Sequence, residues 1–245
     1  MTMKWDSTTV LKVSGLSKRF GRFDALEDVG FELRAGEVLG LIGPNGAGKT
    51  TLFECLAGVL PSNGGLVQIG DRQIDPSERA SLLFYLPDGI APWSGQSVRW
   101  VLDFTIGFFG GDRSIHNELV EQLALKQLLH QPLGTLSKGQ RKRVLLTIGT
   151  TTPQPVLLAD EPFDGLDLRQ TREVAAMLRA HARRGRTLFL SIHQISDAER
   201  VCDRFVLLSG GHVCGEGTLQ QVAALAASRT GAASSDLEEV FLALT

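Results

Sequence analysis

The chain has 245 residues, of which 43% are hydrophobic and 21% are charged, and its formal net charge at pH 7 is -2. This composition is that of an ordinary globular protein with a substantial core, and the small net charge gives no reason to expect nucleic acid or an anionic surface as the main partner. The three cysteines, Cys55, Cys202 and Cys214, show no paired redox or metal-ligand spacing. We therefore expect neither a disulfide framework nor a zinc site, and a reducing cytosol fits best.

The first fifty residues predict strands followed by a glycine-rich turn. The segments "LKVSGLSKRF" and "VGFELRAGEVLGLIG" alternate or run apolar between glycines, which predicts short strands in an antiparallel β portion. The apolar "EVLGLIG" continues directly into "GPNGAGKTTLFECLAGVL", whose later half has helical spacing. This order predicts a strand, a glycine-rich loop and a helix.

The middle of the chain has a different pattern from the segments on either side of it. Three consecutive segments, "GQSVRWVLDFTIGFFGG", "SIHNELVEQLALKQLLH" and "SKGQRKRVLLTIGTT", predict helices. After them, the apolar runs "QPVLLADEP" and "RTLFLSIH" flank the helical "LRQTREVAAMLRAHARRGR", which indicates a mostly parallel sheet covered on both faces. The predicted fold class is α/β, with a core formed by residues 1–88 and 153–217 and a helical subdomain inserted at residues 89–152.

The last part of the chain returns to helical patterns. "TLQQVAALAAS" predicts a short helix and "RTGAASS" a linker. The final "SDLEEVFLALT" contains a capping box, Ser235 with Glu238, ahead of an apolar face. We expect residues 218–245 to form a helical tail that docks on the body of the protein.

The segment "GPNGAGKT" fits the phosphate-loop pattern G-x-x-x-x-G-K-[ST], in the required place between a buried strand and a helix. Glycines let backbone N–H groups surround phosphates, the lysine reaches the β- and γ-phosphates, and the threonine hydroxyl serves Mg²⁺. The sequence therefore predicts a site for ATP and Mg²⁺. Its predicted nucleotide-binding residues are Gly43, Pro44, Asn45, Gly46, Ala47, Gly48, Lys49, Thr50 and Thr51.

Two later strands end in residues that suit the same chemistry. Asp160 and Glu161 follow an apolar run, and two adjacent carboxylates would be costly inside a sheet but can meet a nucleotide at its C-terminal edge. We expect Asp160 to hold Mg²⁺ through water and Glu161 to polarise the attacking water. His193 ends the next apolar run and is predicted to sense the γ-phosphate. The predicted catalytic residues are Glu161, His193 and Lys49.

The phosphate loop, "LSKGQ", "ADEPFDGLD" and the strand-end histidine, in this order, resemble the ATP-binding subunit of ABC transporters over essentially the full length. The resemblance implies ATP hydrolysis coupled to transport, a second ATP-binding subunit, identical or paralogous, and an integral membrane permease on a separate chain. It also implies that "LSKGQ" is the signature motif, which completes the ATP site of the opposite subunit. Ser137 can cap the helix that follows. The implied signature residues are Ser137, Lys138, Gly139 and Gln140.

Three further positions acquire roles through this resemblance. Phe20 matches the aromatic residue that stacks on adenine, and Asp167 matches the loop that communicates between the two ATP sites. Asp88 occupies the position of a glutamine that commonly touches Mg²⁺ and relays to the membrane subunit. We expect Asp88 to keep the relay role and count it with Thr50 and Asp160 as a predicted metal ligand, although a carboxylate adds negative charge near the phosphates. Lys138 is another departure, because glycine is usual there.

Several features resemble the exporter branch for drugs, lipids or polysaccharides: "SKG" in the signature, the acidic residue at position 88 and the ending "LEEVFLALT". An importer ATPase is an alternative, as are a soluble ABC ATPase that acts on ribosomes or DNA and a regulatory nucleotide binder without turnover. Glu161 and His193 argue against the last. Helix-end cations and solvated faces explain the basic runs "RAHARRGR" and Arg141 to Arg143, so nucleic acid is not an expected partner.

The expected location follows from two absences in the sequence. The N-terminal "MTMKWDSTTV" lacks the long apolar run of a secretion signal, and no segment offers the ~20 apolar residues that span a bilayer. We therefore expect a peripheral protein at the cytoplasmic face of the cell membrane, held there by its permease.

Overall fold

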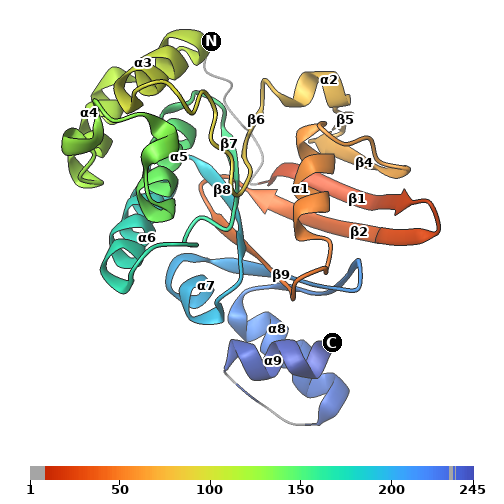
Figure 1. The fold of residues 1–245 in the computed structure, drawn as a ribbon. Helices are drawn as coiled ribbons and strands as arrows, with labels where there is room; N and C mark the ends of the chain where they lie inside the picture. The colour runs from red at the N-terminus through yellow and green to blue at the C-terminus, as the bar shows by residue number, and fades with distance from the viewer. Residues whose placement is uncertain (1–8, 232–233, 235) are drawn as a thin grey trace.

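The computed structural model describes residues 9–231, 234 and 236–245, which contain an antiparallel sheet, a larger sheet and surrounding helices (Figure 1). The antiparallel sheet has the strand order β2-β1-β4-β5, and the larger sheet has the order β10-β9-β3-β8-β7-β6. The strands are β1 (Thr9–Phe20), β2 (Phe23–Arg34), β3 (Val38–Ile42), β4 (Gly64–Ile69), β5 (Arg72–Gln73), β6 (Leu83–Leu86), β7 (Val156–Asp160), β8 (Thr187–Ile192), β9 (Arg204–Ser209) and β10 (His212–Gly217). The helices are α1 (Lys49–Ala57), α2 (Pro76–Arg79), α3 (Val98–Phe109), α4 (Arg113–Gln122), α5 (Lys138–Thr151), α6 (Leu168–Arg183), α7 (Ile195–Val201), α8 (Leu219–Thr230) and α9 (Leu237–Leu244), with 3₁₀ turns η1 (Lys126–Leu128) and η2 (Leu133–Thr135).

The first two strands confirm the predicted antiparallel portion but are longer than expected. Each has twelve residues, and they pair from Thr9 opposite Arg34 to Phe20 opposite Phe23. Gly15, which suggested a break, has φ 65° and lies at a register shift between Val13 and Leu16. A bulge of this kind bends a strand while the strand stays paired. The prediction of short strands was therefore wrong.

The larger sheet confirms the predicted mostly parallel core. β9, β3, β8, β7 and β6 are joined by parallel pairs, and only the edge strand β10 pairs antiparallel, with β9. Side chains of β7 alternate between two cores: Leu157 and Ala159 face the helices of one side, whereas Val156 and Leu158 face the other. Burial on both faces explains why these strands are continuously apolar.

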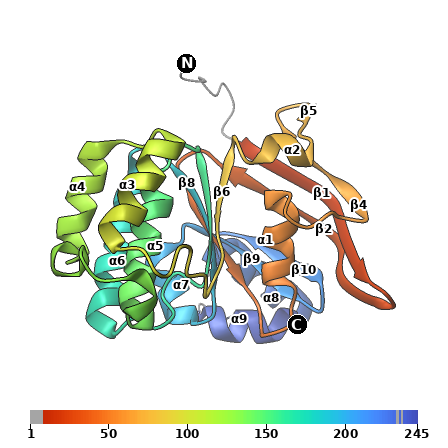
Figure 2. The same ribbon diagram turned by 45° about the horizontal axis from the view of Figure 1, so that its top comes forward.

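The two faces of the larger sheet are covered by different layers. In Figure 2, α1 and the antiparallel sheet lie on one side of β6, and α3, α4, α5 and α6 lie on the other. On the α1 side, the ring centres of Phe53 and Phe189 are 4.9 Å apart in a fully buried contact. This packing fixes α1, and with it the loop that precedes α1, against the C-terminal ends of the parallel strands.

Residues 89–152 contain α3, α4 and α5, but the second predicted helix is shorter than expected. α4 ends at Gln122, and Ala124 adopts φ 50° before the 3₁₀ turn η1. Leu123 and Leu125 are both fully buried. The left-handed conformation of Ala124 cannot continue a right-handed helix, and the turn it makes lets Leu123 and Leu125 pack into the same core. The prediction of a single helix through His130 was therefore wrong.

The C-terminal helices pack together and dock on the body, as predicted. Leu237 and Val240 of α9 are buried, and the Leu237 N–H donates to Glu199 Oε1 of α7 at 3.3 Å. The predicted cap Ser235 lies outside the described residues; in the described part, Asp236 caps α9 by accepting from the N–H groups of Glu238 and Glu239. None of the helices in the described ranges is long and apolar enough to cross a bilayer. The division of the chain at residues 88, 152 and 217 stays a prediction.

Candidate nucleotide site

The predicted phosphate loop connects β3 to α1 in a conformation that requires glycine. Gly46 has φ 81° and Gly48 has φ 105°, in the left-handed region that side chains disfavour. A Cβ on Gly43 would lie 2.3 Å from the carbonyl oxygen of Leu208, so packing also excludes a side chain there. α1 begins without a side-chain cap, which leaves the N–H groups of its first turn available to an anion.

The ammonium group of Lys49 is buried against the backbone of this loop. Its Nζ donates to the carbonyl oxygens of Gly43 at 2.7 Å and Pro44 at 3.3 Å. The same atom lies 3.9 Å from Glu161 Oε1, and the lysine side chain is only 7% exposed. Lys49 and Glu161, predicted from separate motifs, therefore lie next to each other.

Thr50 and Asp160, which were both predicted to serve Mg²⁺, also lie next to each other. The Thr50 hydroxyl donates to Asp160 Oδ2 at 2.8 Å, and the buried Ser191 hydroxyl donates to Asp160 Oδ1. Across the described residues, no group of three or more His, Cys, Asp or Glu side chains could hold a metal ion. Thr50 and Asp160 instead fit Mg²⁺, which prefers one or two protein oxygens supplemented by phosphates and water.

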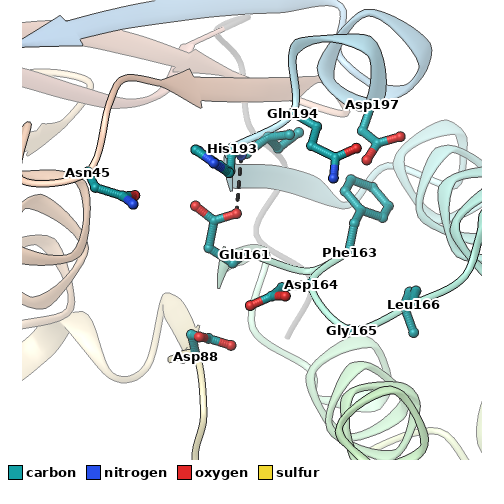
Figure 3. A pocket seen from close by; sticks show the side chains of 11 residues that line it. Asn45, Asp88, Glu161, Phe163, Asp164, Gly165, Leu166, His193, Gln194 and Asp197 are labelled. Atoms are coloured by element: carbon teal, nitrogen blue, oxygen red, sulfur yellow. Dashed lines mark hydrogen bonds between the residues drawn. The ribbon is translucent and has the colours of Figure 1, made fainter.

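Glu161 is held in an unusual backbone conformation. Its φ is 48°, a strained value for a residue with a side chain, and such strain gathers at functional sites. The Glu161 N–H donates to Ser191 Oγ at 2.9 Å, and Oε2 accepts from the backbone N–H of His193 at 3.1 Å (Figure 3). Burial raises the pKa of Glu161, and the nearby Lys49 opposes this increase. The sequence analysis missed Ser191, whose only signal was a hydroxyl within an apolar strand.

Two cavities meet around these residues, and Asn45, Asp88 and Glu161 line both. The cavity on the phosphate-loop side has a volume of about 390 Å³, within the ~300–1,000 Å³ that small-molecule pockets span. The second cavity extends between the loops that follow β6, β7 and β8 to His193 and Asp164 (Figure 3). Three strand ends that are far apart in the sequence therefore open onto one space.

Aromatic side chains border the phosphate-loop cavity at the tip of the β1–β2 hairpin. Phe20 and Phe23 face each other in register and are 47% and 62% exposed. Both line the cavity, and Lys18 Nζ lies 5.0 Å from the Phe20 ring centre. Exposed rings at this place suit the flat face of a nucleobase. Phe20 was predicted; Phe23 was missed because strand pairing, not spacing along the chain, brings it beside Phe20.

The predicted signature residues lie at the start of α5, next to the loop that lines the second cavity. Ser137 caps α5 as predicted, with a reciprocal pair of hydrogen bonds between Ser137 and Gln140. A Cβ on Gly139 would lie 2.4 Å from the Gly165 carbonyl oxygen, and Lys138 forms an ion pair with Asp164. None of the four signature residues lines either cavity. The fold does not bring them to the phosphate loop of the same chain.

Two predicted loop residues have specific partners. Asp88 Oδ1 accepts from Lys142 Nζ of α5 at 2.6 Å. Asp167 caps α6, where its Oδ1 accepts from the Gln170 N–H at 2.8 Å and the Gln170 side chain bonds back to the Asp167 N–H. The capping box "DLRQ" was a sequence signal that the analysis of Asp167 did not use.

The basic runs were interpreted as helix-end cations and solvated faces, and solvation was wrong for three residues. Lys142 is 4% exposed and Arg143 9% exposed. Arg143 donates to the Leu123 carbonyl oxygen at 2.7 Å, and the guanidinium of Arg186 donates to the carbonyl oxygens of Gly149 and Thr150 near the end of α5. Buried carbonyl groups at helix and turn ends need donors, and these cations supply them. Their charges are directed into the protein.

Comparison with known proteins gives consistent matches. The family model described as ABC transporter matches residues 26–164. The chain is 31% identical over 224 residues to the Nod factor export ATP-binding protein I of Ralstonia nicotianae, covering 86% of this chain and 68% of that protein. It is also 31% identical over 237 residues to the phosphonates import ATP-binding protein PhnC 2 of Pseudomonas syringae pv. syringae, covering 86% and 85%. A solved structure of an ATP-binding subunit of an ABC transporter superposes with a TM-score of 0.85 at 27% identity, covering 96% of this chain and 99% of that one.

Proposed function

Since the chain belongs to the ABC transporter family of ATP-binding proteins, we propose that it hydrolyses ATP to drive a membrane transporter as one of two ATP-binding subunits. One observation carries the catalytic part of this proposal. Lys49, Glu161 and the Thr50–Asp160 pair meet at one edge of the parallel sheet, where two cavities join. No other arrangement of buried charges in the described residues combines a phosphate loop with a strained carboxylate.

The proposed roles follow from chemistry and placement. The backbone N–H groups of the phosphate loop and Lys49 bind the β- and γ-phosphates, and Phe20 and Phe23 hold the base. When bound at Thr50 and Asp160, Mg²⁺ would neutralise phosphate charge. Glu161 accepts a hydrogen bond from the attacking water, and its raised pKa favours that role at neutral pH. His193, on the neighbouring loop, lines the second cavity and is proposed to contact the terminal phosphate there.

The proposed pairing of two subunits rests on the position of the signature motif. Ser137 to Gln140 lie outside both cavities of their own chain, at the start of a helix whose dipole favours an anion. A second subunit in head-to-tail arrangement places its own signature motif over this chain's ATP. Asp167 lies at the start of α6, at the end of the loop that begins with Glu161. The same loop contains Asp164, which forms the ion pair with Lys138 of the signature motif.

This pairing is tested by light scattering on a Glu161→Gln variant, which keeps bound MgATP because the attacking water loses its partner. We expect a mass of about twice 26.5 kDa with MgATP and the monomer mass without it. A variant that also carries Lys138→Glu is the control, because a carboxylate at that exposed position would repel the partner's phosphate without a steric clash. A monomer in all conditions would contradict pairing between identical chains.

The proposed permease contact is an exposed aromatic surface formed by Trp93, Trp100, Phe104 and Phe108. The rings of Trp100, Phe104 and Phe108 stack along α3 with neighbouring centres 5.0 and 5.9 Å apart, and the four side chains are 39–71% exposed. Large exposed rings in one row are typical of protein contacts. Trp93 belongs to the same loop as Asp88, so a partner on this surface would touch the segment that borders the ATP cavity. This continuity supports the relay role of Asp88.

We propose a position at the cytoplasmic face of the membrane and export as the direction of transport. The exporter assignment rests on Lys138, Asp88 and the C-terminal "LEEVFLALT". The similarity to a phosphonates import protein keeps import as a second candidate.

Purification of the tagged chain from detergent-solubilised native membranes tests both candidates. A co-purifying permease supports transport, and an extracytoplasmic binding protein encoded or purified with it would favour import. Ribosomal or DNA-bound partners without a permease would contradict both.

The aromatic surface gives this purification a matched control. A Trp100→Ala, Phe104→Ala variant should lose the permease and keep its fold, because both rings are partly exposed. A Leu242→Ala variant removes a hydrophobic side chain that is 68% exposed on α9, far from α3 in Figure 1, and should keep the permease. Equal recovery of the permease with all three proteins would contradict the proposed docking surface.

A further inference from the structure

Carboxylates crowd the part of the site where a terminal phosphate would lie. Asp88, Glu161 and Asp164 all line the second cavity, and Figure 3 shows the three side chains directed toward the same space. Asp88 also lines the phosphate-loop cavity. A carboxylate without a counter-charge at this position would repel a polyanionic nucleotide. The site therefore needs cations beyond Lys49.

Lys142 supplies one of them from inside the protein. Its side chain is 5% exposed, and its Nζ lies 2.6 Å from Asp88 Oδ1 and 3.5 Å from the carbonyl oxygen of Asp160. A buried ammonium is costly unless it is paired, so this contact fixes the loop after β6 to α5 and to the end of β7. One side chain thus connects three elements of the site.

Lys138, four residues earlier on α5, shows why burial matters. It forms an ion pair with Asp164, but the two side chains are 51% and 44% exposed. Solvent screens exposed pairs strongly, and they contribute little. Of the two lysines on α5, Lys142 is the one whose charge is kept from solvent.

Building on the proposed ATP hydrolysis, we propose that Lys142 is a positioning residue that neutralises Asp88 and thereby allows the site to bind ATP in preference to ADP. Asp88 lies at the junction of the two cavities, on the side of Glu161, where the γ-phosphate would be. ADP lacks that phosphate. Loss of the Lys142 charge leaves Asp88 without its counter-charge and therefore weakens ATP binding more than ADP binding. One such charge in a partly exposed site should change the ratio of the two affinities by about tenfold.

The test is a double-mutant cycle on Lys142→Met and Asp88→Asn. Isothermal titration calorimetry of the purified chain gives the Kd of MgATP and of MgADP for the wild type, both single variants and the double variant. We expect Lys142→Met to weaken ATP about tenfold and ADP less than threefold. Asp88→Asn in the Lys142→Met background should return the ratio of the two Kd values to within threefold of the wild type. The matched control is Lys126→Met, which removes an exposed lysine paired with Glu121 and should leave the ratio unchanged.

Two results would overturn the proposal. One is an equal loss of ATP and ADP affinity in Lys142→Met, which is what a general structural defect would produce. The other is a failure of Asp88→Asn to restore the ratio. If Lys142→Met does not fold, Lys142→Gln carries the same test, because its amide still donates to the Asp160 carbonyl oxygen. A wild-type chain that binds neither nucleotide would instead contradict the proposed function.

Discussion

Ser191 holds the two adjacent carboxylates of the site, and removing its hydroxyl tests how Glu161 is positioned. The hydroxyl is fully buried, accepts from the Glu161 N–H at 2.9 Å and donates to Asp160 Oδ1. Ser191→Ala leaves a backbone donor and a carboxylate oxygen without these partners. Each unsatisfied buried group costs ~1–3 kcal/mol, so we expect the free energy of unfolding to fall by about 2–6 kcal/mol. For a chain of this size the melting temperature should fall by roughly 4–24 °C.

The same substitution should reduce ATP turnover, because Ser191 also fixes the strained backbone of Glu161. A displacement of about 1 Å at a catalytic group costs roughly 100-fold. Thr187→Val is the matched control at the other end of β8. The buried Thr187 hydroxyl likewise accepts from one N–H, that of Gly36, and donates to one oxygen, that of Arg34. Thermal unfolding followed by circular dichroism and steady-state phosphate release should show both variants destabilised and only Ser191→Ala slowed. Equal loss of turnover in the two variants would refute the reasoning.

Three further predictions concern Glu161, Gly139 and Asp167. Burial raises the pKa of Glu161, so the folded state binds a proton more tightly than the unfolded state, and the wild type should lose stability relative to Glu161→Gln as the pH rises above its usual value of 4.5. Urea unfolding across this range measures the difference. Gly139→Ala places a methyl group 2.4 Å from the Gly165 carbonyl oxygen and should cost ~1–3 kcal/mol in thermal unfolding. Asp167→Ala removes the cap of α6 and should cost ~1 kcal/mol by the same assay.

The first two of these three predictions have a control in the same chain. Glu118→Gln should show the opposite pH trend, because the Arg184 hydrogen bond lowers the pKa of that exposed carboxyl. Gly107→Ala adds a methyl group to open space on α3 and should be neutral or stabilising. A pH-independent gain in Glu161→Gln, or Gly139→Ala as stable as Gly107→Ala, would show that the assigned cause is wrong. Asp167→Ala with unchanged stability would contradict its capping role.

The parts of the fold that were predicted correctly depend on local pattern. Continuous apolar runs such as "PVLLA" occur where a strand is buried on both faces, and a glycine-rich turn between strand and helix has few uses other than binding phosphate. The sequence therefore predicted that one site would contain Lys49, Thr50, Asp160 and Glu161. The Ser137 cap was predicted for the same reason, since a helix start is a local feature.

The parts that were missed depend on contacts between distant segments. Lys142 lies 54 residues from Asp88 in the chain, and Ser191 lies 30 residues from Glu161. A lysine within "QRKRV" looks solvated until the helix that carries it is known to be buried on nearly every side. The break after α4 was missed for a related reason: the left-handed turn at Ala124, which packs Leu123 and Leu125 into one core, depends on tertiary contacts that override helix propensity.

The central claim, that this site hydrolyses ATP through Glu161, is tested most directly by steady-state phosphate release from MgATP. The account predicts turnover by the purified chain, a loss of about 100-fold or more in Glu161→Gln, and unchanged turnover in the exposed control Glu118→Gln. Calorimetry should show that Glu161→Gln still binds MgATP. Wild-type turnover that persists in Glu161→Gln, or nucleotide binding by the wild type without turnover, would contradict it.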